Sequence, residues 1–269
     1  MVKPVNHRYF DRESKVRDYM LGVSYTCSTI QGNRVAFRSQ HEDLVELVKR
    51  ELRSEHSITP DPRQKSSYVL EFSSPYMIEK LHELGAGVPK QQRRYPEVAN
   101  DNHFIRGITD GQANISGGVD SYLHITICYN KEFLNGMYKV LKQAGVQRDH
   151  PKVRKNVLFL SQDDAMILHD FIYQNWDYVR DRKIYLPSKK QAMENHYKKK
   201  EPDHTNPQVA QRIERAKELL KQGYTGTEVS NLLGYSFSTG FFRAFQKATG
   251  MTPGEFIEQE VTSQTQARS

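Results

Sequence analysis

The side chains best suited to chemical recognition lie near the C-terminal end of the chain, on a segment with helical spacing. Phe241 and Phe245 are four residues apart, so in a helix between about Ser238 and Ala248 they share one face. The remaining positions carry hydroxyl, guanidinium, amide and ammonium groups, which can hydrogen-bond to base edges or bind phosphates. The polar residues of this segment are Ser238, Thr239, Arg243, Gln246 and Lys247.

The spacing of the cysteine and histidine residues does not indicate a metal site or a disulfide. Cys27 and Cys128 are the two cysteines of the chain and do not form a CxxC pair, and its ten histidines are scattered. Structural zinc sites and disulfide frameworks need clustered or regularly spaced ligands. We therefore predict no metal, no cofactor and no disulfide.

The composition fits a folded chain with room for two domains. A length of 269 residues allows one large and one small core, with 37% hydrophobic and 26% charged residues. No apolar run approaches the roughly 20 residues that span a bilayer, and the polar N-terminus lacks the apolar segment of a secretion signal. We expect a cytoplasmic, nucleoid-associated protein without membrane contact.

The charge balance favours a polyanionic partner. The net charge is +7 and the pI is about 9.2. Part of the excess lies in residues 182–200, where seven basic residues stand against one acid. Such a run is typical of a nucleic-acid contact and equally of a solvated linker.

A segment near the N-terminus recurs in the middle of the chain. The sequence DYMLGV at residues 18–23 resembles NHFIRGI at residues 102–108, with Gly22 and Gly107 at corresponding places. Alternating apolar residues and amphipathic stretches then follow in the same order in both copies. In the first copy they predict strands at 28–31, 34–40 and 68–73 and helices at 42–54 and 75–84. In the second they predict strands at 114–116, 122–128 and 156–161 and helices at 131–144 and 163–179.

The repeated helix with a glycine at its centre resembles the motif of the LAGLIDADG homing endonucleases. Glycine costs about 1 kcal/mol in a helix relative to alanine, so two at equivalent positions indicate helices whose backbones approach closely. The segment 183–190, KIYLPSKK, is similar to the tail of that family's domain. The resemblance covers residues 14–190 and implies an α+β fold, a pseudo-symmetric saddle of two αββαββα repeats at 14–95 and 98–190.

The acids on which that family's catalysis depends are missing. In active members the eighth residue of each motif is an acid, and the two acids hold the divalent metal ions that cleave DNA. Aligning the motif with residues 20–28 and 105–113 places Cys27 and Gln112 there. A thiol is too soft for magnesium and an amide is neutral. The sixth-position acid survives once, as Asp110, and we predict no catalytic residue, no bound metal and no DNA cleavage.

The resemblance implies that a twisted antiparallel sheet contacts the major groove. Strand alternation turns Val35 and Phe37, and in the second repeat Ile125 and Ile127, toward the core. The other face then carries residue types that can bind base edges, with further cations on loops. These candidates are Gln31, Arg34, Arg38, Gln40, Asn114, His124 and Thr126 on strands, and Lys65 and Arg154 on loops.

Residues 211–257 look closely similar to the C-terminal half of an AraC/XylS-type DNA-binding domain. The similarity rests on the helix RIERAKELL, on TEVSNLLGYS from Thr227, and on Phe241, Arg243, Phe245, Lys247, Gly250, Thr252 and Pro253. It implies a helix-turn-helix whose second helix enters the major groove, with Thr239 and Arg243 on bases and Thr227 near a phosphate. Thr225 or Thr227 can cap its first helix.

Only one helix-turn-helix unit is visible, whereas AraC-type domains normally contain two. Residues 208–260 hold six basic and six acidic residues, so this unit alone neutralises few phosphates and should bind weakly. The repeat domain or dimerisation must supply the remaining affinity. The predicted organisation is an N-terminal arm (1–13), the repeat domain (14–190), a basic polar linker (191–206), the helix-turn-helix domain (207–260) and a tail (261–269).

Three functions are compatible with these features. We expect a sequence-specific transcriptional regulator, not an enzyme, that binds double-stranded DNA with both modules; the pairing resembles the bacterial WhiA-type sporulation regulators. The alternative is an active homing endonuclease whose metal is held by displaced acids such as Asp110 and Asp120. A third hypothesis is an adaptor or sensor in which only the C-terminal unit contacts DNA. A homodimer partner and RNA polymerase are further candidate contacts.

Overall fold

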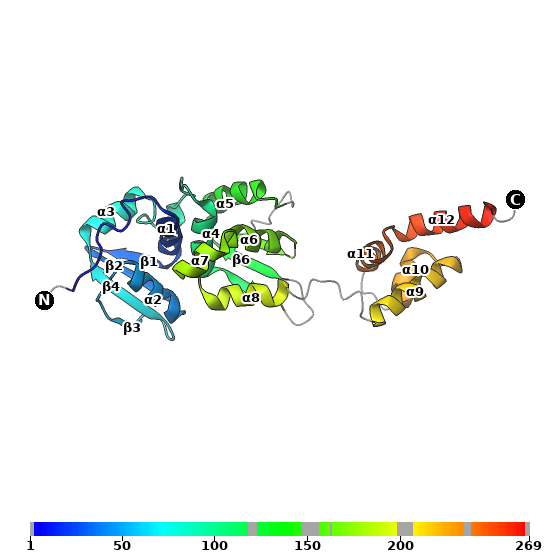
Figure 1. Cartoon of the computed structure of the whole chain (residues 1–269), viewed down its shortest axis with the longest axis horizontal. Coiled ribbons are helices and arrows are strands. Elements are labelled where there is room, and N and C mark those ends of the chain that lie inside the picture. The colour runs from blue at the N-terminus through cyan, green and yellow to red at the C-terminus, as the bar shows by residue number, and fades with distance from the viewer. Residues whose placement is uncertain are drawn as a thin grey trace. The chain divides into compact units, whose positions relative to one another are not determined.

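The chain forms two compact units, Met1–Lys199 and Lys200–Ser269, each with its own hydrophobic core (Figure 1). The computed structural model describes residues 3–117, 123–146, 156–161, 163–197, 207–233 and 238–266. Within these ranges, no helix has both the length and the apolar character needed to cross a membrane.

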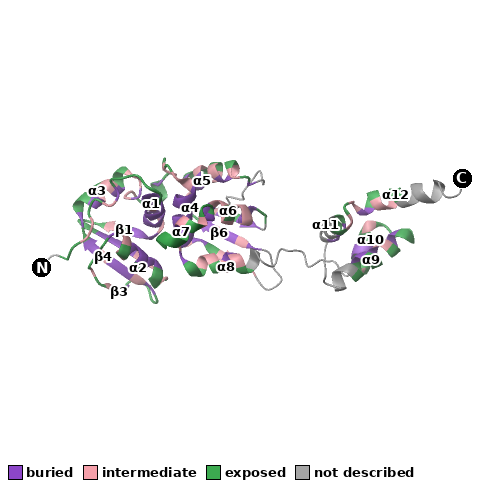
Figure 2. Cartoon of the chain, in the orientation of Figure 1, coloured by how far each residue is buried: buried purple, intermediate pink, exposed green. Residues whose placement is uncertain are grey.

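Two helices pack against each other at the centre of the first unit. α1 (Lys15–Cys27) and α4 (Asp101–Gln112) lie side by side between the two sheets (Figure 1), and most of their residues are buried (Figure 2). The contact is made by backbone: a Cβ atom on Gly22 would lie 3.0 Å from the Cα atom of Gly107 and would collide with the carbonyl oxygen of Phe104. The close approach predicted from the two glycines is confirmed.

The first repeat forms a four-stranded antiparallel sheet in the order β1-β2-β4-β3. Val35 and Phe37 point into the core, where α2 (Glu42–Glu51) and α3 (Pro75–Glu83) pack on β2. The alternation therefore leaves the opposite face for polar side chains. The strands are β1 (Ser28–Gln31), β2 (Arg34–Ser39), β3 (Ile58–Pro60) and β4 (Tyr68–Ser73).

The second repeat follows the same order with a smaller sheet. β6 lies between β5 and β7, and Ile125 and Ile127 of β6 are fully buried. Among the described residues this repeat has no counterpart of β3. The elements are β5 (Asn114–Ser116), β6 (His124–Cys128), α5 (Lys131–Gln143), β7 (Val157–Ser161) and α6 (Asp163–Tyr173). The predicted α+β class is confirmed.

The helix predicted over residues 163–179 is interrupted. Asn175 adopts the left-handed conformation with φ 61°, which separates α6 from α7 (Trp176–Arg182). The fully buried guanidinium of Arg106 on α4 donates to the carbonyl oxygens of Ile172 (2.8 Å) and Ile184 (2.9 Å). These bonds fix both flanks of α7 to the central helix.

The prediction that a basic polar linker (191–206) begins at residue 191 is wrong. α8 (Pro187–Tyr197) continues as a helix to Tyr197, well past the predicted boundary. The sequence there is mostly polar, but Met193 is fully buried and the ammonium group of Lys190 lies 4.1 Å from the ring centroid of Trp176. Tertiary contacts of two side chains therefore stabilise a helix that the composition did not indicate.

The second unit is a small helical domain. Ile213, Ala216, Val229, Phe241 and Phe245 form its core. Its helices are α9 (Pro207–Lys221), α10 (Gly226–Leu232), α11 (Ser238–Thr249) and α12 (Pro253–Gln266).

A reciprocal cap begins α10. The hydroxyl of Thr225 accepts from the backbone amide of Glu228, whose carboxylate accepts from the backbone amide of Thr225 at 2.8 Å. Of the two capping threonines considered, the structure therefore selects Thr225, and Thr227 lies within the first turn.

Replacing Gly22 by Ala should destabilise the first unit by about 3 kcal/mol, because the new methyl group forces two backbones apart. The urea unfolding midpoint measures this change. Glu46→Ala, an exposed substitution on α2, is the control and should change stability by less than about 0.5 kcal/mol. Equal stability of Gly22→Ala and wild type would contradict the backbone contact.

Candidate nucleic-acid interface

The open face of the first sheet carries a row of polar side chains. The register pairs Gln31 with Arg34 and Arg34 with Ser73, while the neighbouring row joins Thr29, Ala36 and Glu71. Residues two apart on one strand share a face, so these rows lie next to each other. The predicted positions of Gln31 and Arg34 on this face are therefore as expected.

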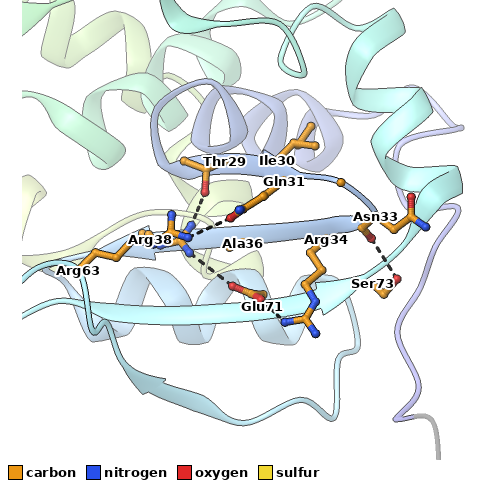
Figure 3. Close-up of a pocket in the computed structure, with 11 residues that line it drawn as sticks. Thr29, Ile30, Gln31, Asn33, Arg34, Ala36, Arg38, Arg63, Glu71 and Ser73 are labelled. Atoms are coloured by element: carbon orange, nitrogen blue, oxygen red, sulfur yellow. Dashed lines mark hydrogen bonds and ion pairs between the residues drawn. The ribbon is translucent and has the colours of Figure 1, made fainter.

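This face forms an open pocket with a volume of about 890 Å³ (Figure 3). Three guanidinium groups and one carboxylate line it, so its lining carries a net positive charge. The charged lining residues are Arg34, Arg38, Arg63 and Glu71, and the neutral polar ones include Thr29, Gln31, Asn33 and Ser73.

The three arginines differ in how far they are engaged within the protein. The Arg34 side chain is 71% exposed, and its Nη1 atom lies 3.0 Å from the Oε1 atom of Glu71. Arg38 is 17% exposed; it pairs with Asp61 (3.3 Å) and Glu71 (3.4 Å) and donates to Thr29. Arg38 was predicted to contact DNA, and in the structure its guanidinium is engaged by these three contacts within the protein.

Arg63 was missed by the sequence analysis. It lies in the loop between β3 and β4 and donates from Nη2 to the Oε1 atom of Gln31 at 3.0 Å. A loop arginine gives no periodic signal, so the sequence pattern could not place it on this face. Of the other predicted residues, Gln40 and Lys65 are exposed, whereas Arg154 lies outside the described residues.

Among the described residues, the strand positions on the open face of the second sheet carry no Asp, Glu, Lys or Arg side chain. Asn114 pairs with Thr126, and Thr126 with Phe159, while His124 occupies the next row. Phe159 is 40% exposed, and its ring centroid lies 5.1 Å from that of His124. The predicted residues Asn114, His124 and Thr126 share this face, and Phe159 is an exposed aromatic residue that the prediction did not include.

The C-terminal ends of α1 and α4 lie together and lead directly into β1 and β5. Cys27 is buried, and its thiol lies 3.7 Å from the carbonyl oxygen of Gly111; burial raises the pKa of this thiol to about 11. The carboxamide of Gln112 donates to the carbonyl oxygen of Cys128 and accepts from the Nζ atom of Lys90 at 2.6 Å.

Two ammonium groups reach this point from distant segments. Lys90 begins the short 3₁₀ helix η1 (Lys90–Gln92), and Lys189 of α8 donates to the carbonyl oxygen of Ala113. Partial burial lowers the pKa of both lysines. Neither lysine was among the residues predicted for the site, although Lys189 belongs to the KIYLPSKK segment.

These donors do not fit a hard divalent cation. A neutral thiol, a carboxamide and two ammonium groups offer no anionic oxygen, which magnesium requires. Across the residues that the structure describes, no three His, Cys, Asp or Glu side chains converge in a way that could hold a metal ion.

Asp110 is buried in the first unit and engaged with its interior. Its Oδ2 atom accepts from the hydroxyl of Tyr19 at 2.8 Å and from the backbone amide of Leu186 at 3.0 Å. Desolvation raises the pKa of this carboxyl to about 7. These bonds join α1, α4 and the start of α8, so Asp110 has a structural role. The other displaced acid considered, Asp120, lies outside the described residues.

In the second unit, the residues predicted to contact DNA lie on α10 and α11. Phe241 and Phe245 are fully buried, with ring centroids 5.7 Å apart, which confirms the apolar stripe of α11. Thr227 on α10 and Gln246 on α11 are exposed. The remaining predicted residues of α11 lie in the helix, but their side chains are outside what the structure describes; they are Ser238, Thr239, Arg243 and Lys247.

The comparison with protein-family models agrees with the resemblance of the second unit. Residues 209–259 match the family model described as a helix-turn-helix domain, which is of the AraC type. No curated protein matches the chain in sequence.

Similar solved structures are LAGLIDADG homing endonucleases. The I-SmaMI meganuclease bound to uncleavable DNA is 11% identical, with 75% of this chain and 97% of that chain covered and a TM-score of 0.43. The I-LtrWI LAGLIDADG homing endonuclease bound to target DNA is 10% identical, with 72% and 93% covered and a TM-score of 0.41. Variants of the homing endonuclease I-DmoI are 17% identical, with 59% and 97% covered and a TM-score of 0.36.

These structures contradict the prediction that the chain is not an enzyme. The proteins to which it is similar are named as DNA endonucleases, so we withdraw that prediction. The side chains of Cys27 and Gln112 show only that this position lacks ligands for a divalent metal ion, and they do not decide whether the protein is an enzyme.

Asp110→Asn should flatten the pH dependence of stability. The folded carboxyl has a pKa of about 7, above the unfolded value of about 3.9, so the folded state holds the extra proton. In the wild type, the contribution of the Asp110 carboxyl to the free energy of unfolding is therefore fully present below about pH 4 and is lost as the pH rises toward 7. Urea midpoints across this window measure the effect. Equal slopes for variant and wild type would contradict it.

Proposed function

We propose that the protein is a sequence-specific regulator of transcription that binds double-stranded DNA through both units. The observation that carries this proposal is the AraC-type helix-turn-helix at residues 209–259, beside a first unit whose open sheet face bears Arg34 and Arg63. Helix-turn-helix domains place their second helix in the major groove. The modules proposed to bind DNA are residues 14–190 and 207–260, and the proposed setting is the bacterial cytoplasm.

Charge distribution explains why two units are needed. The basic and acidic residues of 208–260 are equal in number, whereas sequence-independent affinity comes from the neutralisation of phosphates. The first unit supplies exposed cations on and near its open face, among them Arg34, Arg63 and Lys65. In this proposal the first unit provides affinity and part of the specificity, and α11 reads further bases with Thr239 and Arg243.

Lys90 and Lys189 hold backbone phosphates near the middle of the bound site in this proposal. Lys90 donates to Gln112 and Lys189 to the carbonyl oxygen of Ala113, two adjacent residues at the point where α4 passes into β5. An ammonium group in a partly buried setting attracts a phosphate more strongly than one in open solvent, because the local dielectric constant is lower. Neither lysine requires a divalent cation for this contact.

Binding-site selection with the full chain tests sequence-specific recognition. The wild type should enrich one sequence from a random duplex library, and Arg243→Ala should weaken binding to it by about 1–3 kcal/mol, or roughly 5- to 150-fold. Arg34→Ala should also weaken binding. Lys139→Ala, which removes an exposed charge from α5, is the matched control and should bind as the wild type does. Failure to enrich any sequence would contradict the proposal.

A reporter gene placed behind the selected sequence tests regulation. Its expression should change when the protein is supplied and should return to the basal level with Arg243→Ala. Unchanged expression would contradict a role in transcription. The same DNA incubated with Mg²⁺ or Mn²⁺ measures endonuclease activity, and gel filtration of the bound complex measures whether two copies bind.

Removing both central ammonium groups should reduce the salt dependence of binding. The double variant Lys90→Met and Lys189→Met should lower the slope of log K against log salt by about 2, since each phosphate contact contributes about 0.9. Fluorescence anisotropy at several salt concentrations measures the slope. A slope equal to that of the wild type in a folded double variant would contradict the proposed phosphate contacts.

A further inference from the structure

We infer that Arg34 and Glu71 together recognise a single G·C base pair. This inference rests on the proposed function and assigns a base preference to one position of its binding surface. The two side chains lie on the neighbouring strands β2 and β4, with the Nη1 atom of Arg34 3.0 Å from the Oε1 atom of Glu71 (Figure 3). Both are accessible from the open face, Arg34 at 71% and Glu71 at 34%.

A neighbouring guanidinium on the same face, that of Arg38, holds the carboxylate of Glu71 in place. The Nη2 atom of Arg38 lies 3.4 Å from its Oε2 atom, and the Nε atom of the same guanidinium lies 3.3 Å from Asp61. The Asp61 side chain is only 2% exposed and also accepts from the backbone amide of Arg63 at 3.0 Å. Arg38 and Asp61 are therefore positioning residues, which fix the carboxylate of Glu71 before any DNA arrives.

A fixed carboxylate is unfavourable on a surface that only binds phosphates. It repels the DNA backbone, and the long-range part of this repulsion persists over about 10 Å at moderate salt. The cost is offset where the carboxylate accepts a hydrogen bond from a base. Cytosine N4 is the donor that glutamate and aspartate accept from in the major groove.

The paired side chains match the hydrogen-bonding edge of one base pair. In the major groove, a G·C pair presents the acceptors N7 and O6 of guanine and then the donor N4 of cytosine. Arg34 offers donors and Glu71 offers an acceptor at an adjacent position, which is the complementary order. An A·T pair presents acceptor, donor, acceptor, so its N6 group would meet the guanidinium and its O4 atom the carboxylate. Both contacts are unfavourable, and the pair therefore discriminates against A·T.

The pocket lining supports a base pair as the occupant. Glu71 lies among the polar groups that would surround a small anion, where it would oppose that anion. The neutral donors and acceptors around it, Gln31, Asn33 and Ser73, are residue types that contact bases or backbone in a duplex. The open pocket, with a volume of about 890 Å³, also has room for the edge of a base pair in the major groove.

Selection from a randomised duplex library tests the inference with the full chain. The wild type should require G·C at one position, and Glu71→Gln should keep its preferences elsewhere but lose at least about tenfold in preference at that position. Glu71→Gln should also bind unrelated DNA more tightly, because a negative charge is removed from the surface. Glu46→Gln makes the same charge change at an exposed position of α2, and this variant should select the same sequence as the wild type.

Arg34→Ala provides a second, independent measurement. It should lower affinity for the G·C site toward that of the site with A·T substituted at the same position, so the two sites become nearly equal. If Glu71→Gln and Arg34→Ala both keep the full preference, the inference is overturned while the proposed function stands. If the wild type selects no sequence, the proposed function fails as well.

Discussion

The fold of the first unit depends on the contact between the backbones of α1 and α4. Gly22 and Gly107 allow this approach, since any larger residue would place a methyl group inside the neighbouring helix. Each helix continues into the first strand of a sheet, so the separation of the helices sets the separation of the sheets. The spacing between the polar side chains of one open face and those of the other follows from this distance, whereas the positions within each face follow from the strand register.

A series of ion pairs on the first sheet runs from a buried carboxylate to an exposed guanidinium. Asp61 and Arg38 form a half-buried pair that engages Glu71, and Glu71 in turn orients the exposed Arg34. Surface ion pairs contribute little to stability. Their importance here is geometric, because a chain of pairs anchored by a buried carboxylate restricts the rotamers of the outermost guanidinium.

Much of the fold could be predicted from periodicity, whereas the site depends on long-range contacts. β1 and β4 match their predicted limits because alternating apolar residues identify a half-buried strand. Glu71 was not among the predicted residues because its pairing with Arg34 depends on the β2–β4 register, which sequence spacing does not fix. Lys90 and Lys189 are far apart in the sequence but contact the adjacent residues Gln112 and Ala113, and α8 is stabilised by the burial of Met193 within a polar sequence.

The two halves of the first unit share an architecture but not a surface chemistry. One sheet carries arginines and a carboxylate, and the other carries His124, Thr126 and the exposed ring of Phe159. Two identical faces would favour palindromic DNA and could bind it in either direction. If both faces bind DNA as proposed, these unlike faces would favour a sequence with distinct left and right halves, and a single copy of the chain would then have a defined polarity along the duplex.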